Sequence, residues 1–293
     1  MVHKLFKDGV YQAPEEYKED IEELRQWLTE QHHLPTLTDE HLNLFLHSCE
    51  GNLMRTKVTM ENYFTLRTHT PELFANRNPL SNDIQEINLV PLAHSSREGY
   101  KVLVYRLTNY EPSKLNFTAG IKMFLMYNDM RLAEDGLEPG YIVVFDMKGI
   151  TLGHLSRINL SIIKKFIVYI QDCHPARLKG IHVINTVSFI DKVMTIIKPF
   201  LKGSIMQIIH FHGGVQSLEK YMSLEILPQE YGGQGDSFNV YHAQQRKLLE
   251  EEYVTWFREE ENYKVDESKR KGKKNTQADT YGARGSFRKL AID

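Results

Sequence analysis

Four segments between residues 175 and 233 decide the fold of this chain: PARLKGIHVIN (175–185), IKPFL (197–201), HFHG (210–213) and LPQEYGG (227–233). In order, they indicate an apolar strand, the end of an apolar helix that a proline breaks, a second strand and a glycine-rich exit. A helix that is apolar along most of its length and lies between two strands could cover an internal cavity. The stretch therefore predicts strands and helices packed in layers around a hydrophobic hollow.

Strands and helices alternate through the middle of the chain. We expect strands over 101–107, 141–146, 178–185 and 204–211, and helices over 116–134, from 159, and over 188–201. Strands that alternate with helices of 10 to 15 residues are typical of βαβ units. The sequence therefore predicts an α/β fold with a mainly parallel sheet.

Composition divides the chain into three regions. Residues 1–80 contain short amphipathic helices and predict a small helical domain. Residues 81–262 contain the α/β pattern and end in an acidic helix over 241–262. Residues 263–293 are basic and polar, and they predict a disordered tail.

The bulk composition is that of a soluble protein. A net charge of −2 gives no global field for nucleic acid, and the two cysteines are too few for a disulfide framework. No apolar stretch at the start predicts a signal peptide, and the densest apolar run, 166–170, is far shorter than the roughly 20 residues that span a bilayer. We expect a reduced protein in the cytoplasm, without a nucleic-acid partner.

Polar residues near the strands suggest two kinds of catalytic or metal site. His210 and His212 share a strand face, where His182 of a neighbouring strand could join them at a zinc ion, or all three could be ordinary strand histidines. Asp146 and Lys148 follow a strand, as catalytic groups of α/β enzymes do, but an acid there is more often a turn or cap residue. No carboxylate at ligand spacing supports a metal, and no nucleophile accompanies Asp146. We predict no metal, no cofactor and no enzymatic activity.

The apolar helix expected over 188–201 has two interpretations. Its apolar residues cover more than half of its circumference, which usually marks a core helix. It could instead be a movable lid, apolar inside toward a cargo and outside toward a membrane, with Pro199 as its hinge.

Two cations, Arg177 and Lys179, project to one side at the start of a predicted strand. Such a pair can bind a phosphate group. The arginine does so through two hydrogen bonds, and the lysine acts as a point charge. The alternative is a solvated end of the sheet, because surface charges are common.

Taken together, the motifs resemble those of the CRAL-TRIO lipid-binding family, the group that contains α-tocopherol transfer protein, retinaldehyde-binding protein and clavesins. In the first domain the resemblance consists of WL (27–28), HLP (33–35), LFL (44–46), NYF (62–64), Arg67 and PELF (71–74). In the core it consists of FD (145–146), Gly149, KGIH (179–182), IN (184–185), KPFL (198–201), His210, HG (212–213), LP (227–228) and EYGG (230–233). The set covers nearly the whole chain and is specific, whereas any one motif alone would be weak.

The resemblance implies a function as well as a fold. It implies five or six strands under a hydrophobic ligand cavity, and a lid that ends at 198–201 and opens at a membrane. The implied function is the binding and transfer of a tocopherol-, retinoid- or other lipid-like molecule by a monomer that contacts membranes transiently. The alternative is a phosphoinositide-dependent membrane adaptor or sensor without net lipid transfer.

The resemblance also implies site residues. Those for cargo contact are Met123, Tyr127, Tyr141, Val143, Phe145, Ile158, Phe166, Tyr169, Ile170, Ile181, Ile190, Val193, Ile197 and Leu201. For phosphoinositide contact it implies Arg177 and Lys179, whereas Cys49, Ser204 and Ile208 stand where the family usually has basic residues. Met123 and Tyr127 stand where vitamin E binders have serines, which suggests a different or smaller cargo.

Overall fold

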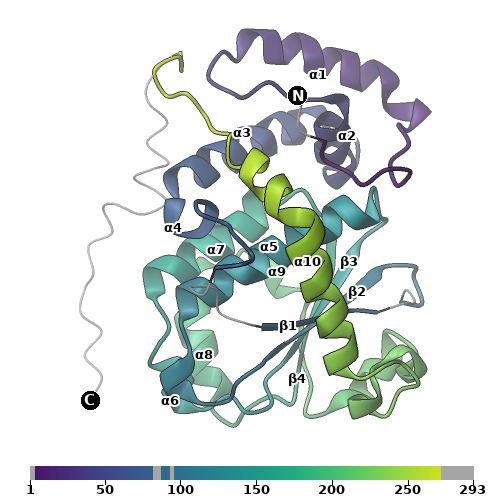
Figure 1. The fold of residues 1–293 in the computed structure, drawn as a ribbon, viewed down its shortest axis with the longest axis vertical. Helices are drawn as coiled ribbons and strands as arrows, with labels where there is room; N and C mark the ends of the chain where they lie inside the picture. Colours follow the sequence, from purple (N-terminus) through teal and green to yellow (C-terminus); the bar gives the residue numbers. More distant parts are fainter. Residues whose placement is uncertain (1–3, 82–86, 93–95, 272–293) are drawn as a thin grey trace.

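The computed structural model describes residues 4–81, 87–92 and 96–271, and its centre is a five-stranded sheet (Figure 1). The strands are β1 (Ile87–Pro91), β2 (Lys101–Leu107), β3 (Tyr141–Asp146), β4 (Leu178–Ile184) and β5 (Ile209–Phe211), and they lie side by side in chain order. β1 is antiparallel to β2, and the other neighbours are parallel. The predicted α/β class with a mainly parallel sheet is confirmed.

The ends of two strands differ from the sequence prediction. The strand expected over 204–211 is only β5, because Gly203–Met206 forms the short helix α9, in which Met206 N donates to Lys202 O. β1 was not predicted. It is an edge strand that ends at Pro91, a residue that central strands exclude because it has no N–H to donate.

Both faces of the sheet are covered. Leu103 and Tyr105 of β2 pack on one face with α5 (Phe117–Asp135) and α7 (Leu160–Asp172), while Val102 and Val104 pack on the other with the segment 215–238. This alternation follows from the two-residue repeat of a strand. The long helix α10 (Phe238–Glu260) crosses the sheet beside β1 and reaches α5 (Figure 1).

The amino-terminal helices form the end of the molecule beyond the sheet (Figure 1). They are α1 (Lys18–Glu30), α2 (Asp39–Ser48), α3 (Leu53–His69) and α4 (Pro71–Phe74). Thr38 caps α2 in a reciprocal arrangement with His41, and the Asn52 side chain accepts from Arg55 N at the start of α3. α3 ends just before Thr70-Pro71, because the residue that precedes a proline disfavours the helical conformation.

A buried ionic network joins these helices to the rest of the protein. Arg67 of α3 contacts Asp129 of α5 and Glu260 of α10, at 3.1 Å in each case, and Arg77 also contacts Asp129. All four side chains are nearly inaccessible to solvent. Removing one member would leave a buried charge uncompensated, which makes this network important for stability.

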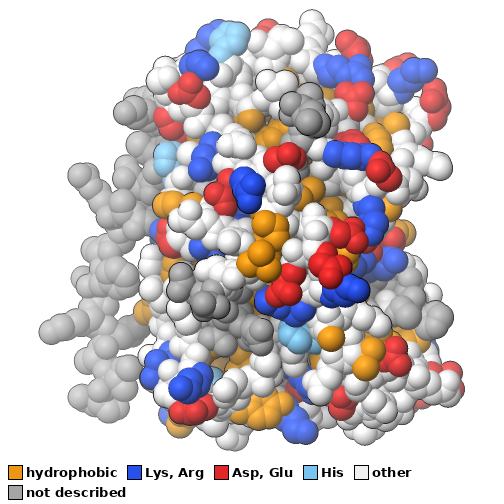
Figure 2. Space-filling view, viewed as in Figure 1, with side chains coloured by type: hydrophobic (Ala, Val, Ile, Leu, Met, Phe, Trp, Pro, Cys, Tyr) orange, Lys and Arg blue, Asp and Glu red, His pale blue; other side chains and the backbone are white. Residues whose placement is uncertain are grey.

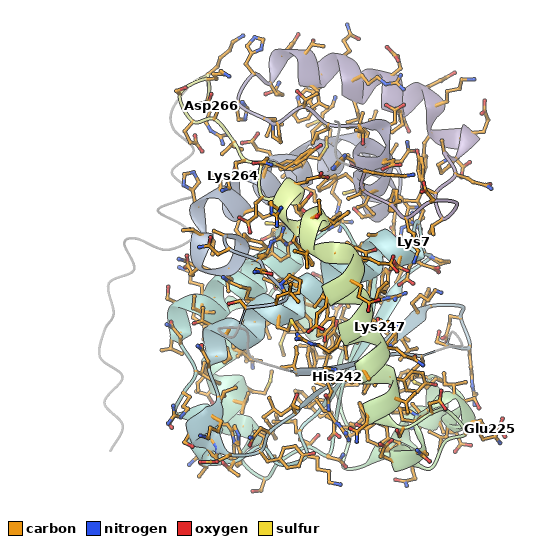
Figure 3. The ribbon with its side chains drawn as sticks, viewed as in Figure 1. Lys7, Glu225, His242, Lys247, Lys264 and Asp266 are labelled. Carbon is orange, nitrogen blue, oxygen red and sulfur yellow. The ribbon has the colours of Figure 1, made fainter. Side chains whose placement is uncertain are left out.

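The chain after α10 folds back onto α3 and the loop before α2. Val265 N donates to Thr68 Oγ1, and Asp266 N donates to His33 O. Figure 3 shows Lys264 and Asp266 beyond the end of α10, beside the amino-terminal helices. Val265 of the predicted tail is therefore buried, the other residues of 263–271 are partly or fully exposed, and residues 272–293 lie outside the described residues.

The surface seen in Figure 2 mixes Lys and Arg with Asp and Glu, without a continuous patch of one sign on its described part. Within the described ranges, no helix is both long and apolar enough to cross a bilayer.

Candidate ligand-binding cavity

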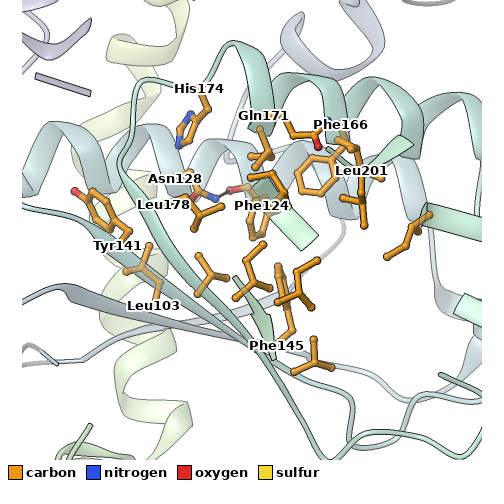
Figure 4. Close-up of a pocket in the computed structure, with 18 of the residues that line it drawn as sticks. Leu103, Phe124, Asn128, Tyr141, Phe145, Phe166, Gln171, His174, Leu178 and Leu201 are labelled. Atoms are coloured by element: carbon orange, nitrogen blue, oxygen red, sulfur yellow. Dashed lines mark hydrogen bonds between the residues drawn. The ribbon is translucent and has the colours of Figure 1, made fainter. Parts of the chain in front are cut away.

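A cavity of about 370 Å³ lies between the sheet and the helices α5, α7 and α8 (Ile190–Ile197) (Figure 4). Its floor includes a row of side chains from four neighbouring strands, Leu103, Val143, Ile181 and Ile209, each in register with the next. The row forms because residues in register on parallel strands point to the same face. An apolar floor of this width follows directly from the strand sequences.

The roof of the cavity is the apolar helix that the sequence singled out. Its inward residues are Ile190, Val193, Met194 and Ile197, followed by Leu201. Its exposed residues are Asp191, Lys192 and Thr195, all of them polar. Ile196 of the same helix is partly exposed and borders neither cavity, so an apolar outer face toward a membrane stays a prediction.

The carboxyl end of the roof is attached to α7 through Gln171, which also lines the cavity. Its side-chain amide donates to Phe200 O over 3.1 Å and accepts from Lys202 N over 2.6 Å. Pro199 lies just before this attachment, in the short 3₁₀ turn Lys198–Phe200. The predicted hinge at Pro199 is thus followed directly by two hydrogen bonds that attach the chain to α7.

A second cavity of about 290 Å³ adjoins the first. The two share the side chains of Phe124, Phe145, Met147, Phe166 and Val193. Phe124 packs on Phe145 with ring centroids 5.8 Å apart and on Phe166 at 5.3 Å. A cluster of aromatic rings therefore separates the two spaces.

Most of the residues implied for cargo contact border these cavities. The larger one is lined by Tyr141, Val143, Phe145, Phe166, Ile170, Ile181, Ile190, Val193, Ile197 and Leu201, and the smaller one by Ile158. Met123, Tyr127 and Tyr169 border neither and are fully buried in the packed core. On α5 the cavity side is instead Phe124, Asn128 and Arg131, spaced by one helical turn.

The sequence prediction missed the polar side chains of the lining. They are Asn128, Arg131, Gln171 and His174. The spacing of Phe124, Asn128 and Arg131 was a usable signal, but α5 is apolar on its other faces as well. His174 follows α7, where no periodicity indicates the direction of a side chain.

The predicted phosphate-binding pair is engaged within the protein. Arg177 Nε donates to His47 O at the end of α2 over 2.6 Å, and Lys179 Nζ lies 3.0 Å from Glu50 Oε1. The hydrogen bond from Lys179 holds the pKa of the Glu50 carboxyl below its usual value. At the other positions where the resemblance leads us to expect basic residues, Cys49 is buried, Ser204 is exposed and Ile208 is partly buried.

His182 of β4, His210 of β5 and His212, the residue after β5, form a contact cluster. His182 Nδ1 and His212 Nε2 lie 2.9 Å apart, and the rings of His182 and His210 both pack against Tyr221. Burial, and then His212 and His210, lower the pKa of His182 to about 4, so it is uncharged at neutral pH. No group of His, Cys, Asp or Glu in the described residues has the arrangement of a metal site.

Asp146 has the surroundings of a residue that organises turns. Its carboxylate accepts from Lys148 N and Asn185 Nδ2 over 2.8 Å and from Tyr231 Oη over 2.6 Å. Asn185 has a positive φ of 50°, a conformation that these bonds help to hold.

Comparisons with known proteins show which family models and which relatives this chain is similar to. Residues 87–233 match the family model of the CRAL/TRIO domain, and residues 13–84 match that of the Pinta-like UBA domain. The alpha-tocopherol transfer protein-like protein of Mus musculus is 31% identical over 245 residues, which cover 79% of this chain and 71% of that protein. Clavesin-2 of Homo sapiens is 26% identical over 261 residues, 86% of this chain and 78% of that protein. A weaker likeness, at 12% identity and a TM-score of 0.46, relates 79% of this chain to 92% of the chain in the crystal structure of Sfh5.

The matched family model and the identity with the transfer protein-like relatives show that this chain belongs to the CRAL/TRIO family, whose members bind and transfer small lipophilic ligands.

Proposed function

We propose that this protein carries one small lipophilic molecule in the cavity under α8 and transfers it between membranes without chemical change. The observation that carries the proposal is the cavity itself, a space of about 370 Å³ lined almost wholly by apolar side chains. Its size is within the range of about 300–1,000 Å³ that is usual for small-molecule sites.

Apolar burial supplies enough free energy for such binding. At about 25 cal/mol per Å², enclosing several hundred Å² of apolar ligand surface contributes on the order of 10 kcal/mol before ordering costs. The same ligand would be poorly soluble in water, so a carrier would determine where it is delivered.

The proposed path of entry is displacement of α8. No residue of α8 is fully buried, because its inner side chains face the cavity instead of a packed core. Elements with few buried apolar contacts open at low free-energy cost. We propose that α8 moves while the rest of the sheet and its helices stay in place, and that a membrane surface receives the exposed apolar side chains.

The adaptor alternative receives less support. Arg177 Nε already donates to His47 O and Lys179 is paired with Glu50, so fewer of their donors are available to a phosphoinositide headgroup. In the adaptor alternative the apolar cavity would be vestigial or regulatory, whereas the carrier function uses it directly.

The test is extraction of the purified protein with organic solvent, together with native mass spectrometry of the intact complex. We expect one lipophilic molecule per chain, and transfer of that molecule from donor to acceptor vesicles. Protein that retains no lipid from a broad panel, and that transfers none, would rule out the carrier function.

A further inference from the structure

The strand β5 is a thin part of the cavity wall. It has three residues, lies at the edge of the described sheet and pairs with β4. Ile209 and Phe211 both line the large cavity, and 43% of Phe211 is also exposed to solvent. The side chains of β5 therefore separate the cavity from water at this edge, and separation of β5 from β4 would open the cavity there.

The face of β4 and β5 that points away from the cavity carries imidazole rings. His182 is in register with His210, next to the cavity-lining pair Ile181 and Ile209, and side chains alternate between faces along a strand. The rings of His182 and His210 lie 5.0 Å apart, and that of His212 lies 5.1 Å from His182. Three imidazoles thus connect the two strands directly behind the cavity floor.

The central contact of this cluster depends on the charge of its two rings. His182 Nδ1 and His212 Nε2 lie 2.9 Å apart, so one imidazole donates the hydrogen bond and the other accepts it. A proton on both rings leaves two N–H donors facing each other, and the hydrogen bond is lost. His182 is 1% and His212 7% exposed, so water does not hydrate these charges while the strands stay paired.

The elements packed around the cluster add a cation, a phenol and an apolar side chain. The 3₁₀ segment η4 (Val215–Lys220) and Tyr221 cover it on one side. The Tyr221 ring packs 4.2 Å from that of His182, and Lys220 contributes a positive charge. On the other side of β4, Val144 of β3 is in register with His182. The cluster is therefore surrounded by groups that do not compensate an added positive charge.

These surroundings oppose protonation of the closed pair. Burial, followed by His212 and His210, lowers the pKa of His182 to about 4. Burial, followed by His210 and Lys220, lowers the pKa of His212. No carboxylate is among the described groups that shift the pKa of either ring. Protonation therefore favours a movement that separates the rings or exposes them to water.

We propose that the paired strands β4 and β5 form a proton-operated exit: in acid His182 and His212 take up protons, β5 separates from β4, and the cargo leaves past Phe211. At neutral pH this edge stays closed, and α8 remains the path of entry. The inference rests on the proposed carrier function and adds acid-triggered release by a second route.

The direction of the response follows from the two states of the edge. When the edge is open, a hydrated histidine has its ordinary pKa near 6.5, whereas the pKa of His182 is about 4 when the edge is closed. The closed edge is therefore favoured above pH 6.5, and this preference is lost as the pH falls toward 4. Between pH 7 and pH 5 the ratio of open to closed edges rises about 20-fold from His182 alone.

Release of an apolar probe in the absence of membranes tests the proposal. The full-length protein is loaded with N-phenyl-1-naphthylamine, a fluorophore that stays uncharged at both pH values, and is mixed with excess methyl-β-cyclodextrin, which captures the released probe. We expect dissociation to be at least about tenfold faster at pH 5 than at pH 7, with unchanged far-UV circular dichroism. Because no membrane is present, displacement of α8 by a lipid surface does not contribute.

Substitution of the pair locates the response. The double variant His182→Gln with His212→Gln keeps side chains that can hydrogen-bond across the strands but do not titrate. Its dissociation rates at pH 5 and pH 7 should agree within about twofold. His174→Gln is the matched control, because His174 is also buried, lines the same cavity and has a pKa lowered to about 4 by burial. This variant should keep the acid response of the native protein.

Hydrogen exchange of the native protein measures the movement without any substitution. His212 N donates to Val183 O over 2.8 Å, and Ile181 N donates to Ile208 O over 2.9 Å, so both amides are protected only while the strands are paired. After correction for intrinsic exchange rates, protection over 208–212 should be about tenfold lower at pH 5 than at pH 7. Protection of β3 should stay the same.

The outcomes separate the acid exit from the carrier function. Equal probe dissociation at pH 5 and pH 7, an acid response that survives in the folded double variant, or unchanged protection over 208–212 would overturn the exit and leave the carrier function standing. Loss of the acid response in His174→Gln would assign it to that residue and would also overturn the exit. Failure of the probe to bind at pH 7, together with failure to extract any lipid, would overturn both proposals.

Discussion

The ammonium group of Lys179 lies 3.0 Å from the carboxylate of Glu50, so an ion pair connects β4 to the turn that follows α2. The cation that the sequence assigns to a phosphate is thus held by the amino-terminal helices. About 30% of the Lys179 side chain and 59% of the Glu50 side chain are exposed, so the pair is accessible and contributes little to stability.

Releasing Lys179 should strengthen binding to anionic membranes. We expect Glu50→Gln to bind vesicles that contain phosphoinositide about two- to fivefold more tightly than the native protein, because roughly 1 kcal/mol of attraction per cation becomes available. Vesicle flotation at fixed salt measures the effect. Glu225→Gln, in the segment after β5, makes the same change of charge away from Lys179 (Figure 3). Equal gains in the two variants would show that net charge alone is responsible.

A charge on the inner side of α8 should disrupt ligand retention. Val193→Asp and Ile197→Asp each place a carboxylate against the cavity, where an unpaired charge costs several kcal/mol. We expect the bound lipid to dissociate at least tenfold faster in a vesicle-transfer assay. Thr195→Asp, on the exposed side of the same helix, is the matched control. Unchanged retention in both inner variants would contradict the role of α8 as a roof.

Substitutions in the buried ionic network that joins α3 to α5 and α10 should lower stability more than substitutions in exposed ion pairs. Asp129→Asn leaves Arg67 and Arg77 buried with one carboxylate fewer, and we expect the free energy of unfolding to fall by about 3–5 kcal/mol. Urea denaturation measures the change. Asp39→Asn breaks the pair with Arg25, whose side chains are about half exposed, and should cost under about 1 kcal/mol. Similar losses in the two variants would argue against a buried network.

Mild acid should destabilise the protein through its buried imidazole. Because the pKa of His174 is about 4 in the folded protein and near 6.5 when unfolded, the unfolded chain binds a proton first as the pH falls. Stability should therefore decrease between pH 6.5 and 4, by roughly 1–3 kcal/mol for this residue, and no further below that range. His174→Phe should show a correspondingly smaller loss in urea denaturation at pH 7 and pH 4.5. Parallel losses in the two proteins would show that His174 is protonated in the folded state as well.

The strands could be predicted from sequence more fully than the site. The run Tyr141–Asp146 is apolar at nearly every position, which identifies a strand covered on both faces and gives its bounds directly. α5 is apolar on several faces, so its periodicity does not show whether Phe124 or Met123 faces the cavity. A rotation of one residue moves a side chain by about 100° around a helix axis, and this places Met123 and Tyr127 in the core.

Contacts between distant segments were beyond the reach of the sequence pattern. The pairing of Lys179 with Glu50 depends on how the amino-terminal helices dock on the sheet, which no local spacing determines. The same holds for His174, whose unpaired nitrogen becomes visible only when every neighbouring donor and acceptor has been placed.

The aromatic side chains that the two cavities share act as a common partition. Truncating Phe124, Phe145 or Phe166 would enlarge both compartments together, so altered uptake in such a variant could not be assigned to either one. Ile170 borders only the larger cavity and Ile158 only the smaller one. Substituting each of them separately would therefore show which cavity holds the ligand.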